Sequence, residues 1–475
     1  MSPHRRPILA ATLLFAPWAL GLSDAALFAQ TPAAAPTPSA EEAMLKKIYT
    51  DALVHGQAFD NLRALVTTSP GRLAGSKSLE RAVTWGDQTL AALKLDRVFQ
   101  QDVMVPHWER GAKESVTLLP PAGVKGEAVA LTAVALGGSV AGDVTAEVVE
   151  VQSLPELEQL GREKLAGKIV FFNRPMNPAY YSPGPAYGEA GDARNRGPAA
   201  AAKYGPAGVL TRSLTHARDD VPHTGMTTYA PDQPKFPAAA LSFLAADKLA
   251  AALAADPHTR VTMKINSRWF DPAPSHNVVG EIRGSAFPNE IILVGGHLDS
   301  WDIAPGAHDD GAGVVQSIEV LRLFRALGIQ PRHTLRAVLF TNEENGTAGA
   351  VAYAAAAREQ KEKHIFAVET DNGGFQPHGF NLGSTQGDVA ERAARWLPLF
   401  RPYGIFEFRK GNAGTDVTPL LVLGATVGEM TPDSQRYFDI HHTAEDSLDK
   451  VNPRELELGA AALASLIWLV DTQGL

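Results

Sequence analysis

The second half of this 475-residue chain alternates continuously apolar runs with amphipathic stretches, and this alternation limits the fold more than any other feature. Apolar runs at Ile291–Gly296, Leu335–Thr341 and Phe366–Thr370 predict strands, and Val314–Leu327 and Ala348–Ala357 predict helices between them. Strands that are apolar at every position are buried on both faces, which is typical of a parallel sheet covered by helices. We therefore predict an α/β fold with a mixed, mostly parallel sheet flanked by helices.

Other parts of the chain follow different patterns. Apolar residues recur at helical spacing from residue 41 to about residue 94, whereas short β-runs and Ala-rich helices fill residues 128–261. We predict one α/β domain formed by residues 41–127 and 262–475, interrupted by a small β-rich domain at residues 128–261. Its Pro/Gly/Tyr-rich segment, residues 175–191, is expected to be a surface loop, with a substrate-covering lid as the alternative.

The N-terminus has the layout of a secretory signal peptide. Arg5 and Arg6 precede the apolar run Ile8–Leu22, and small residues follow as far as Ala29. The run is short for a membrane span of ~20 residues, so an uncleaved anchor is the less favoured alternative. We predict a signal peptide at residues 1–29, a flexible linker at residues 30–40, and a soluble mature protein that is exported to the periplasm or secreted, with no membrane partner.

Charge and cysteine content exclude several kinds of site and partner. The chain has 43 Lys and Arg against 52 Asp and Glu, a net charge of −9, and no block of basic residues. Nucleic acid is therefore not expected as a partner, because a phosphate backbone needs a basic surface. The chain has no cysteine, which excludes disulfides, thiolate-bound metals and a thiol nucleophile. Any metal site must be built from histidines and carboxylates.

Histidines and acidic residues follow each predicted strand, where ligands bind in sheets of this kind. The segments are GGHLDSWD (His297, Asp299, Asp302), GAHDDGAG (His308, Asp309, Asp310), TNEENG (Glu343, Glu344), ETDNGG (Asp371) and IHHTAEDS (His441, His442, Glu445, Asp446). So many like charges at one edge would repel one another unless cations bind there. A two-metal site with one bridging carboxylate accommodates them and suits hydrolysis. In the pair Glu343–Glu344, one carboxylate can bind metal while the other acts as a general base.

The order of these motifs resembles the M28 family of dinuclear zinc exopeptidases, which has the zinc-exopeptidase, phosphorylase/hydrolase-like fold. The segments SPGRLAGS, at Ser69–Ser76, and SHNVVGEI, at Ser275–Ile282, are also similar to that family. Residues 128–261, with LAGKIVFF and KYGPAGVL, resemble the protease-associated domain that some members insert near the active site. The double histidine and the GTD at Gly414–Asp416 are most similar to the carboxypeptidase Q branch, which the family associates with dipeptide hydrolysis.

The resemblance implies a metal-binding role for five residues. His297 and Asp371 would bind one zinc ion, Glu344 and His442 would bind the other, and Asp309 would bridge both. His442 is preferred over its neighbour because the family pattern places an aspartate four positions after the ligand.

The resemblance also implies roles around these ligands. Glu343 would accept the proton of the attacking water and deliver it to the leaving amine. Asp299 would orient His297 from behind, and His441 would stabilise the oxyanion.

Three further residues are expected to serve the site without binding metal, or are left open. Asp310 is expected to cap the following helix. His308 is expected to line the site without binding metal. Asp416 is left open between a substrate contact and a turn cap.

The sequence thus predicts an exported exopeptidase with two Zn²⁺ per chain that hydrolyses dipeptides or short peptides. Cobalt or manganese would also suit such a donor set, and the sequence does not rank them. An N-terminal aminopeptidase of the same family is one alternative; a glutaminyl cyclase-like acyltransferase and a non-catalytic binding protein are others. A homodimer is an expectation drawn only from the branch it resembles.

Overall fold

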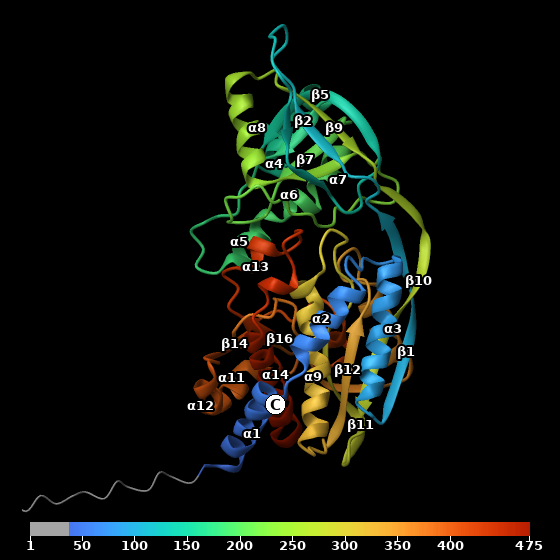
Figure 1. The fold of residues 1–475 in the computed structure, drawn as a ribbon, viewed down its shortest axis with the longest axis vertical. Helices are drawn as coiled ribbons and strands as arrows, with labels where there is room; N and C mark the ends of the chain where they lie inside the picture. Colours follow the sequence, from blue (N-terminus) through green and yellow to red (C-terminus); the bar gives the residue numbers. More distant parts are fainter. Residues whose placement is uncertain (1–37) are drawn as a thin grey trace, which may run out of the picture.

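Two eight-stranded sheets organise the chain (Figure 1). The structure is a computed structural model that describes residues 38–475, so the predicted signal peptide and most of the predicted linker lie outside the described residues. In Figure 1 the first sheet and its helices occupy the lower half and the second sheet the upper half. The long strands β1 (Arg97–Glu109) and β10 (Arg268–Ile282) pair with each other and run from one half towards the other.

The first sheet is mixed, with a parallel centre, as the apolar runs predict. Its strand order is β1-β10-β12-β11-β13-β16-β14-β15. The four strands β12, β11, β13 and β16 are parallel to one another, and antiparallel pairings attach β10 to β12 and β14 to β16. The bounds are β11 (Phe287–His297), β12 (His333–Phe340), β13 (Lys363–Glu369), β14 (Pro377–Gly383), β15 (Glu407–Lys410) and β16 (Thr426–Pro432).

Helices cover both faces of this sheet. Ile292 and Val294 of β11 belong to a hydrophobic cluster with residues of α1, α3, α9 and α14, whereas Ile291 and Leu293 belong to a cluster with α10 on the opposite face. Because side chains alternate between the faces of a strand, both halves of the apolar run are buried. The helices are α1 (Ala40–His55), α2 (Ala58–Thr68), α3 (Lys77–Ala92), α9 (Ala312–Ala326), α10 (Ala348–Glu359), α11 (Val389–Ala393), α12 (Leu397–Phe400), α13 (Tyr437–Ile440) and α14 (Pro453–Gln473).

The second sheet is built by residues 115–265, here called the insert. Its strand order is β3-β2-β9-β5-β6-β7-β8-β4. The strands are β2 (Ser115–Leu118), β3 (Val129–Leu131), β4 (Ala133–Ala135), β5 (Gly142–Val151), β6 (Ile169–Phe172), β7 (Gly208–Arg212), β8 (Ala238–Leu241) and β9 (Arg260–Ile265). The boundary predicted at residue 128 therefore lies inside this sheet, because β2 pairs with β9, which is far away in the sequence.

Helices accompany the second sheet as well. They are α4 (Leu154–Leu165), α5 (Pro183–Ala190), α6 (Asp192–Asn195), α7 (Gly197–Ala202) and α8 (Phe243–Ala255). The segment 175–191, expected to be a surface loop, thus contains α5. Ala186 and Ala190 of this helix are buried in a cluster with Phe375 and Tyr437 from the other half of the molecule. This tertiary contact, and not local sequence, explains the ordered helix.

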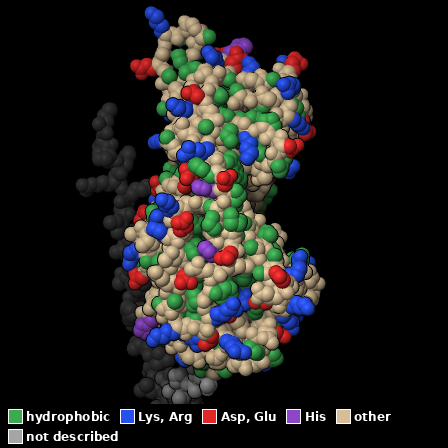
Figure 2. All heavy atoms as spheres, turned by 90° about the vertical axis from the view of Figure 1, so that its right-hand side faces the viewer, with side chains coloured by type: hydrophobic (Ala, Val, Ile, Leu, Met, Phe, Trp, Pro, Cys, Tyr) green, Lys and Arg blue, Asp and Glu red, His purple; other side chains and the backbone are tan. Residues whose placement is uncertain are grey.

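The surface shows basic and acidic side chains interspersed on the face drawn in Figure 2. No helix within residues 38–475 is long and apolar enough to cross a membrane.

Candidate active site

The candidate residues gather at the carboxyl ends of the parallel strands. His297 is the last residue of β11, Glu343–Glu344 follow β12, and Asp371 follows β13. Asp309 lies in the turn η1 (Ala307–Gly311) that leads into α9, and His441–His442 follow α13. Parallel strands direct their carboxyl ends to the same edge of the sheet, so motifs far apart in sequence meet there.

Asp309 lies between two groups of side chains. Its Oδ1 is 3.3 Å from Nε2 of His297, and the same nitrogen is 3.4 Å from Oδ1 of Asp371. Its Oδ2 is 3.3 Å from Nε2 of His442, which is 3.1 Å from Oε2 of Glu344. The structure therefore brings together all five residues for which the sequence suggests metal binding, as two groups that share one carboxylate.

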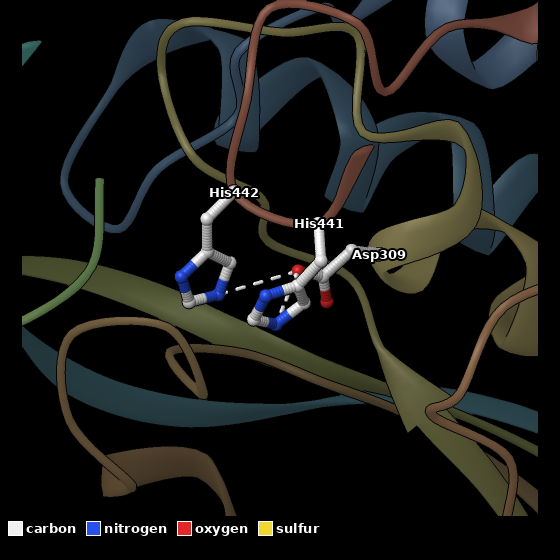
Figure 3. Close-up of side chains that lie close together, drawn as sticks. All are labelled: Asp309, His441 and His442. Carbon is white, nitrogen blue, oxygen red and sulfur yellow. Dashed lines mark ion pairs between the residues drawn. The ribbon is translucent and has the colours of Figure 1, made fainter. Parts of the chain in front are cut away.

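His441 also reaches this carboxylate (Figure 3). Its Nε2 is 3.4 Å from Oδ2 of Asp309, and its ring stacks on that of His442 with centroids 3.6 Å apart. Two sets of donor atoms in the described residues are close enough to hold an ion: Asp309 with His441 and His442, and His297 with Asp310 and Asp371.

Asp310 differs from the others because backbone N–H groups occupy its carboxylate. Its Oδ2 accepts from the N–H of His297 at 3.0 Å, and its Oδ1 accepts from the N–H of Gly313, in the first turn of α9, at 2.9 Å. These contacts match the capping role expected from the sequence.

Asp299 contacts His297 in a different way from the one expected. The Nδ1 of His297 lies 3.1 Å from the backbone carbonyl oxygen of Asp299 and 3.9 Å from its carboxylate. The carboxylate instead accepts the backbone N–H groups of Glu343 at 3.0 Å and Glu344 at 3.2 Å. Asp299 therefore orients the histidine through its main chain and the acidic pair through its side chain.

Two supporting residues hold the loops of the site. Asp446 accepts the N–H groups of His308 at 2.7 Å and Asp309 at 3.1 Å, which anchors the turn η1. Arg72, fully buried in the SPGRLAGS segment, donates to the carbonyl oxygens of Leu298 at 2.5 Å and Gly306 at 2.8 Å. Sequence reasoning noted these segments without assigning these roles, because main-chain donors and acceptors leave no side-chain signature.

Burial and the close packing of charged groups shift the pKa values of the carboxylates in the site. Burial raises the pKa of Glu343 to about 7, although His297 acts in the opposite direction. Burial and then the charge of Asp309 raise the pKa of Glu344. Burial alone would raise the pKa of Asp309 too, but nearby imidazoles, first that of His441, lower it. Carboxylates packed this closely need a compensating positive charge to remain ionised together.

A divalent cation fits this cluster. Asp309 Oδ2 and Asp371 Oδ1 are buried, and within residues 38–475 neither accepts a hydrogen bond. A buried carboxylate oxygen without a donor is costly. His and carboxylate donors around two centres are a set that suits zinc and similar ions.

The cluster opens into a cavity of about 510 Å³ that both halves of the molecule line. The lining residues are Tyr187, Arg194, Asn195, Met226 and Thr228 from the insert, and Asp309, Glu343, Glu344, Asn345, Gly346, Asp371, His441 and His442 from the half of the molecule that contains the first sheet. Sequence reasoning singled out none of these insert residues, since they lie in short helices and loops without a motif, although Tyr187 belongs to the segment 175–191 for which a lid was the alternative.

His308 and Asp416 are outside this lining, as are His297, Asp299 and Asp310. The Nδ1 of His308 accepts from the N–H of Gly374 at 3.1 Å, and its ring stacks on Phe375. Asp416 is buried, its N–H donates to Glu369 Oε2 at 2.9 Å, and burial followed by the charge of Glu369 raises its pKa. Neither geometry places these side chains against a ligand in the cavity.

Known proteins are similar to this chain in sequence and in fold. The model of the family described as "Peptidase family M28" matches residues 277–467. Carboxypeptidase Q of Bos taurus is 34% identical over 88% of this chain and 86% of its own, and that of Homo sapiens is 33% identical over 88% and 86%. A solved structure of a peptidase M28 precursor from Shewanella amazonensis has a TM-score of 0.86 and 32% identity, covering 92% of this chain and 97% of its own.

These findings and the site define the class of protein as a metallo-exopeptidase. The chain belongs to peptidase family M28. An aminopeptidase from Aneurinibacillus sp. strain AM-1, with a TM-score of 0.61 and 22% identity over 90% of this chain and 95% of its own, shares the fold.

Proposed function

We propose that this protein is an exported exopeptidase that binds two zinc ions and hydrolyses dipeptides or short peptides. The observation that carries the proposal is the position of the Asp309 carboxylate between two histidines. Its Oδ1 is 3.3 Å from Nε2 of His297, and its Oδ2 is 3.3 Å from Nε2 of His442. A second carboxylate accompanies each histidine. Such a geometry suits two ions bridged by one carboxylate.

The roles of the residues follow from their positions. His297 and Asp371 would hold one ion, Glu344 and His442 the other, and Asp309 both. Two bound ions would polarise the peptide carbonyl and lower the pKa of a water molecule.

Glu343 and His441 line the cavity without being needed as ligands in this assignment. Glu343, beside the ligand Glu344, would accept a proton from the attacking water and donate it to the leaving amine. The imidazole of His441 would face the developing oxyanion.

Metal analysis tests the proposal. The purified mature protein is expected to contain about two zinc ions per chain and to lose hydrolysis of dipeptides when a chelator removes them. Activity should return on addition of zinc, and cobalt or manganese can be compared in the same assay. A protein that binds no divalent ion and is equally active in chelator would overturn it.

Arg194 favours substrates with a free carboxylate. Its guanidinium is buried, and its hydrogen bonds go to the uncharged groups Asn195 Oδ1 at 3.2 Å, Thr224 O at 3.1 Å and Tyr187 OH at 2.6 Å. Within the described residues it forms no ion pair with a carboxylate. A guanidinium has five N–H groups, so two are left for a ligand. A buried charge of this kind favours a carboxylate partner, which supports dipeptidase or carboxypeptidase action over N-terminal aminopeptidase action.

Replacing Arg194 tests the substrate class. R194Q is expected to raise KM for free dipeptides by roughly 10- to 100-fold, the effect of losing a charge-assisted hydrogen bond. It should leave KM for the same dipeptides with an amidated C-terminus nearly unchanged. R196Q, at an exposed arginine two positions further on, is the matched control and should behave as the wild type. Equal changes for free and amidated substrates would contradict the assignment.

The remaining alternatives predict different products. A glutaminyl cyclase-like enzyme would cyclise peptides with an N-terminal glutamine, and turnover of aminoacyl chromogenic substrates but not of free dipeptides would favour an aminopeptidase. Export, the protease-associated character of the insert and a homodimer remain proposals that cell fractionation, an experimental structure and light scattering would check.

A further inference from the structure

The insert contacts the segment that carries His442, and the contacts run in both directions. The N–H of Thr224 donates to the carbonyl oxygen of His442 at 2.9 Å, and Nδ1 of His442 lies 3.3 Å from the carbonyl oxygen of Thr224. Beside them, Nδ1 of His223 lies 2.9 Å from the carbonyl oxygen of His441. His223 and Thr224 are buried. Three hydrogen bonds therefore tie the two segments together in the interior.

These contacts determine how His442 can bind an ion. A carbonyl oxygen only accepts hydrogen bonds, so the proton of a neutral His442 ring lies on Nδ1, and the lone pair of Nε2 is free. That nitrogen faces Glu344 Oε2 at 3.1 Å and Asp309 Oδ2 at 3.3 Å. A partner that fixes the tautomer and the ring orientation of a metal-binding histidine typically affects metal affinity strongly.

The contacts with Thr224 also restrain an unusual backbone conformation of His442. Its φ is +61°, in the left-handed region that side chains other than glycine rarely adopt. A residue stays in that region only when its surroundings hold it there. The hydrogen bond from Thr224 to the carbonyl oxygen of His442 is such a restraint.

The His223–Thr224 segment is itself anchored in the second sheet. Thr224 Oγ1 donates to the carbonyl oxygen of Ala135, the last residue of β4, at 2.9 Å. The N–H of His223 donates to Ser213 Oγ at 2.8 Å, and that hydroxyl donates to Leu241, at the end of β8. The position of the segment thus depends on the fold of the insert.

Within the described residues, the hydrogen bonds of His297 involve no residue of the insert. The ring of His297 contacts the main chain of Asp299, and its N–H donates to Asp310, both in the same half of the molecule as the first sheet. We propose that the His223–Thr224 segment positions His442, so that the insert completes one of the two ion-binding groups while the first sheet builds the other alone. This inference rests on the proposed metal binding.

Two variants of His223 separate this positioning role from a general effect on folding. H223L removes the N–H donor to His441 at similar volume, whereas H223N retains a donor near the position of Nδ1. H258L, at an exposed histidine of the insert, is the matched control. A further variant, T224V, removes the hydroxyl that anchors the segment to β4 but keeps the shape of the side chain.

The readout is the zinc retained per chain after dialysis against a graded series of chelator concentrations, together with thermal unfolding. H223L and T224V are expected to release one ion at about 10- to 100-fold lower chelator concentration and to hold the other as the wild type does. H223N and H258L should retain both. H223L holding both ions as tightly as the wild type, or losing both together, would overturn the inference. A wild type that binds no zinc overturns the proposed function itself, and the inference with it.

Discussion

A single residue, Asp309, shows how position gives a common side chain an uncommon role. Its carboxylate lies between the imidazoles of His297 and His442, and its backbone N–H donates a hydrogen bond to the carboxylate of Asp446. A carboxylate after a strand is ordinary in any sequence. Only the ordered series of motifs made a bridging role predictable, and the direction in which each oxygen points came from the fold.

Glu343 and its neighbour allow a prediction about chemistry as distinct from metal binding. E343Q is expected to keep about two zinc ions per chain and to lower kcat for dipeptides by roughly 100-fold or more, since a general base typically contributes 10²- to 10⁴-fold. E344Q is the comparison, because Glu344 lies 3.1 Å from His442 and should lose metal as well as activity. Metal content and kcat are measured on the same samples. An E343Q enzyme with wild-type kcat would remove Glu343 from the reaction.

At the scale of elements, the local sequence pattern predicted which strands are buried but not where each strand begins and ends. The apolar runs predicted the three strands β11, β12 and β13, because burial on both faces leaves no polar position within a strand. The structure extends β11 back to Phe287, beyond the apolar run, through pairing with β12. The pairing of β2 with β9 had no local signal, since such a contact joins residues more than a hundred positions apart.

The packing of helices α9 and α14 against the start of α2 predicts a dependence of stability on pH. Burial, and then the charge of Glu457, raises the pKa of Glu319 from 4.5 to about 8. Since the folded state favours the protonated carboxyl, this contribution is fully present below about pH 4.5 and is lost as the pH rises through about 8.

E319Q is therefore expected to flatten the fall in the free energy of unfolding across this pH range. Urea unfolding of the wild type and the variant at several pH values between 5 and about 8.5 measures the effect. E359Q, at an exposed position of α10, should keep the wild-type dependence. Identical slopes for E319Q and the wild type would contradict the raised pKa.

At the scale of the whole molecule, polar as well as apolar contacts hold the insert against the half of the molecule that contains the first sheet. Arg110, where β1 leads into the insert, donates from Nε to Asp302 Oδ2 at 2.9 Å and from Nη2 to Asp302 Oδ1 at 2.7 Å. The same guanidinium donates to the carbonyl oxygen of Ala135 and to Thr224 Oγ1. One side chain thereby connects the loop after β11 with the segment that contacts His442.

This connection predicts a measurable coupling. A double-mutant cycle of R110A and D302A is expected to give a coupling free energy of about 1.5–3 kcal/mol in denaturant unfolding, because both side chains are largely shielded from water and the contact is bidentate. The exposed pair Arg63 and Asp60 is the control and should couple by less than about 1 kcal/mol. Coupling as weak as that of the control would show that the Arg110–Asp302 pair contributes no more to stability than an exposed ion pair does.

The sequence by itself predicted the α/β class and the burial of the strands, and its resemblance to a known family predicted one site for His297, Asp309, Glu344, Asp371 and His442. It could do so because strand burial and motif order are written in short, contiguous stretches. Tertiary structure alone decided which oxygen faces which histidine, that Arg194 enters the cavity and that Thr224 holds His442. Those features depend on the packing of the insert against a loop that is distant in the sequence. Such contacts form between two segments, and neither segment has a local sequence pattern that predicts the other as its partner.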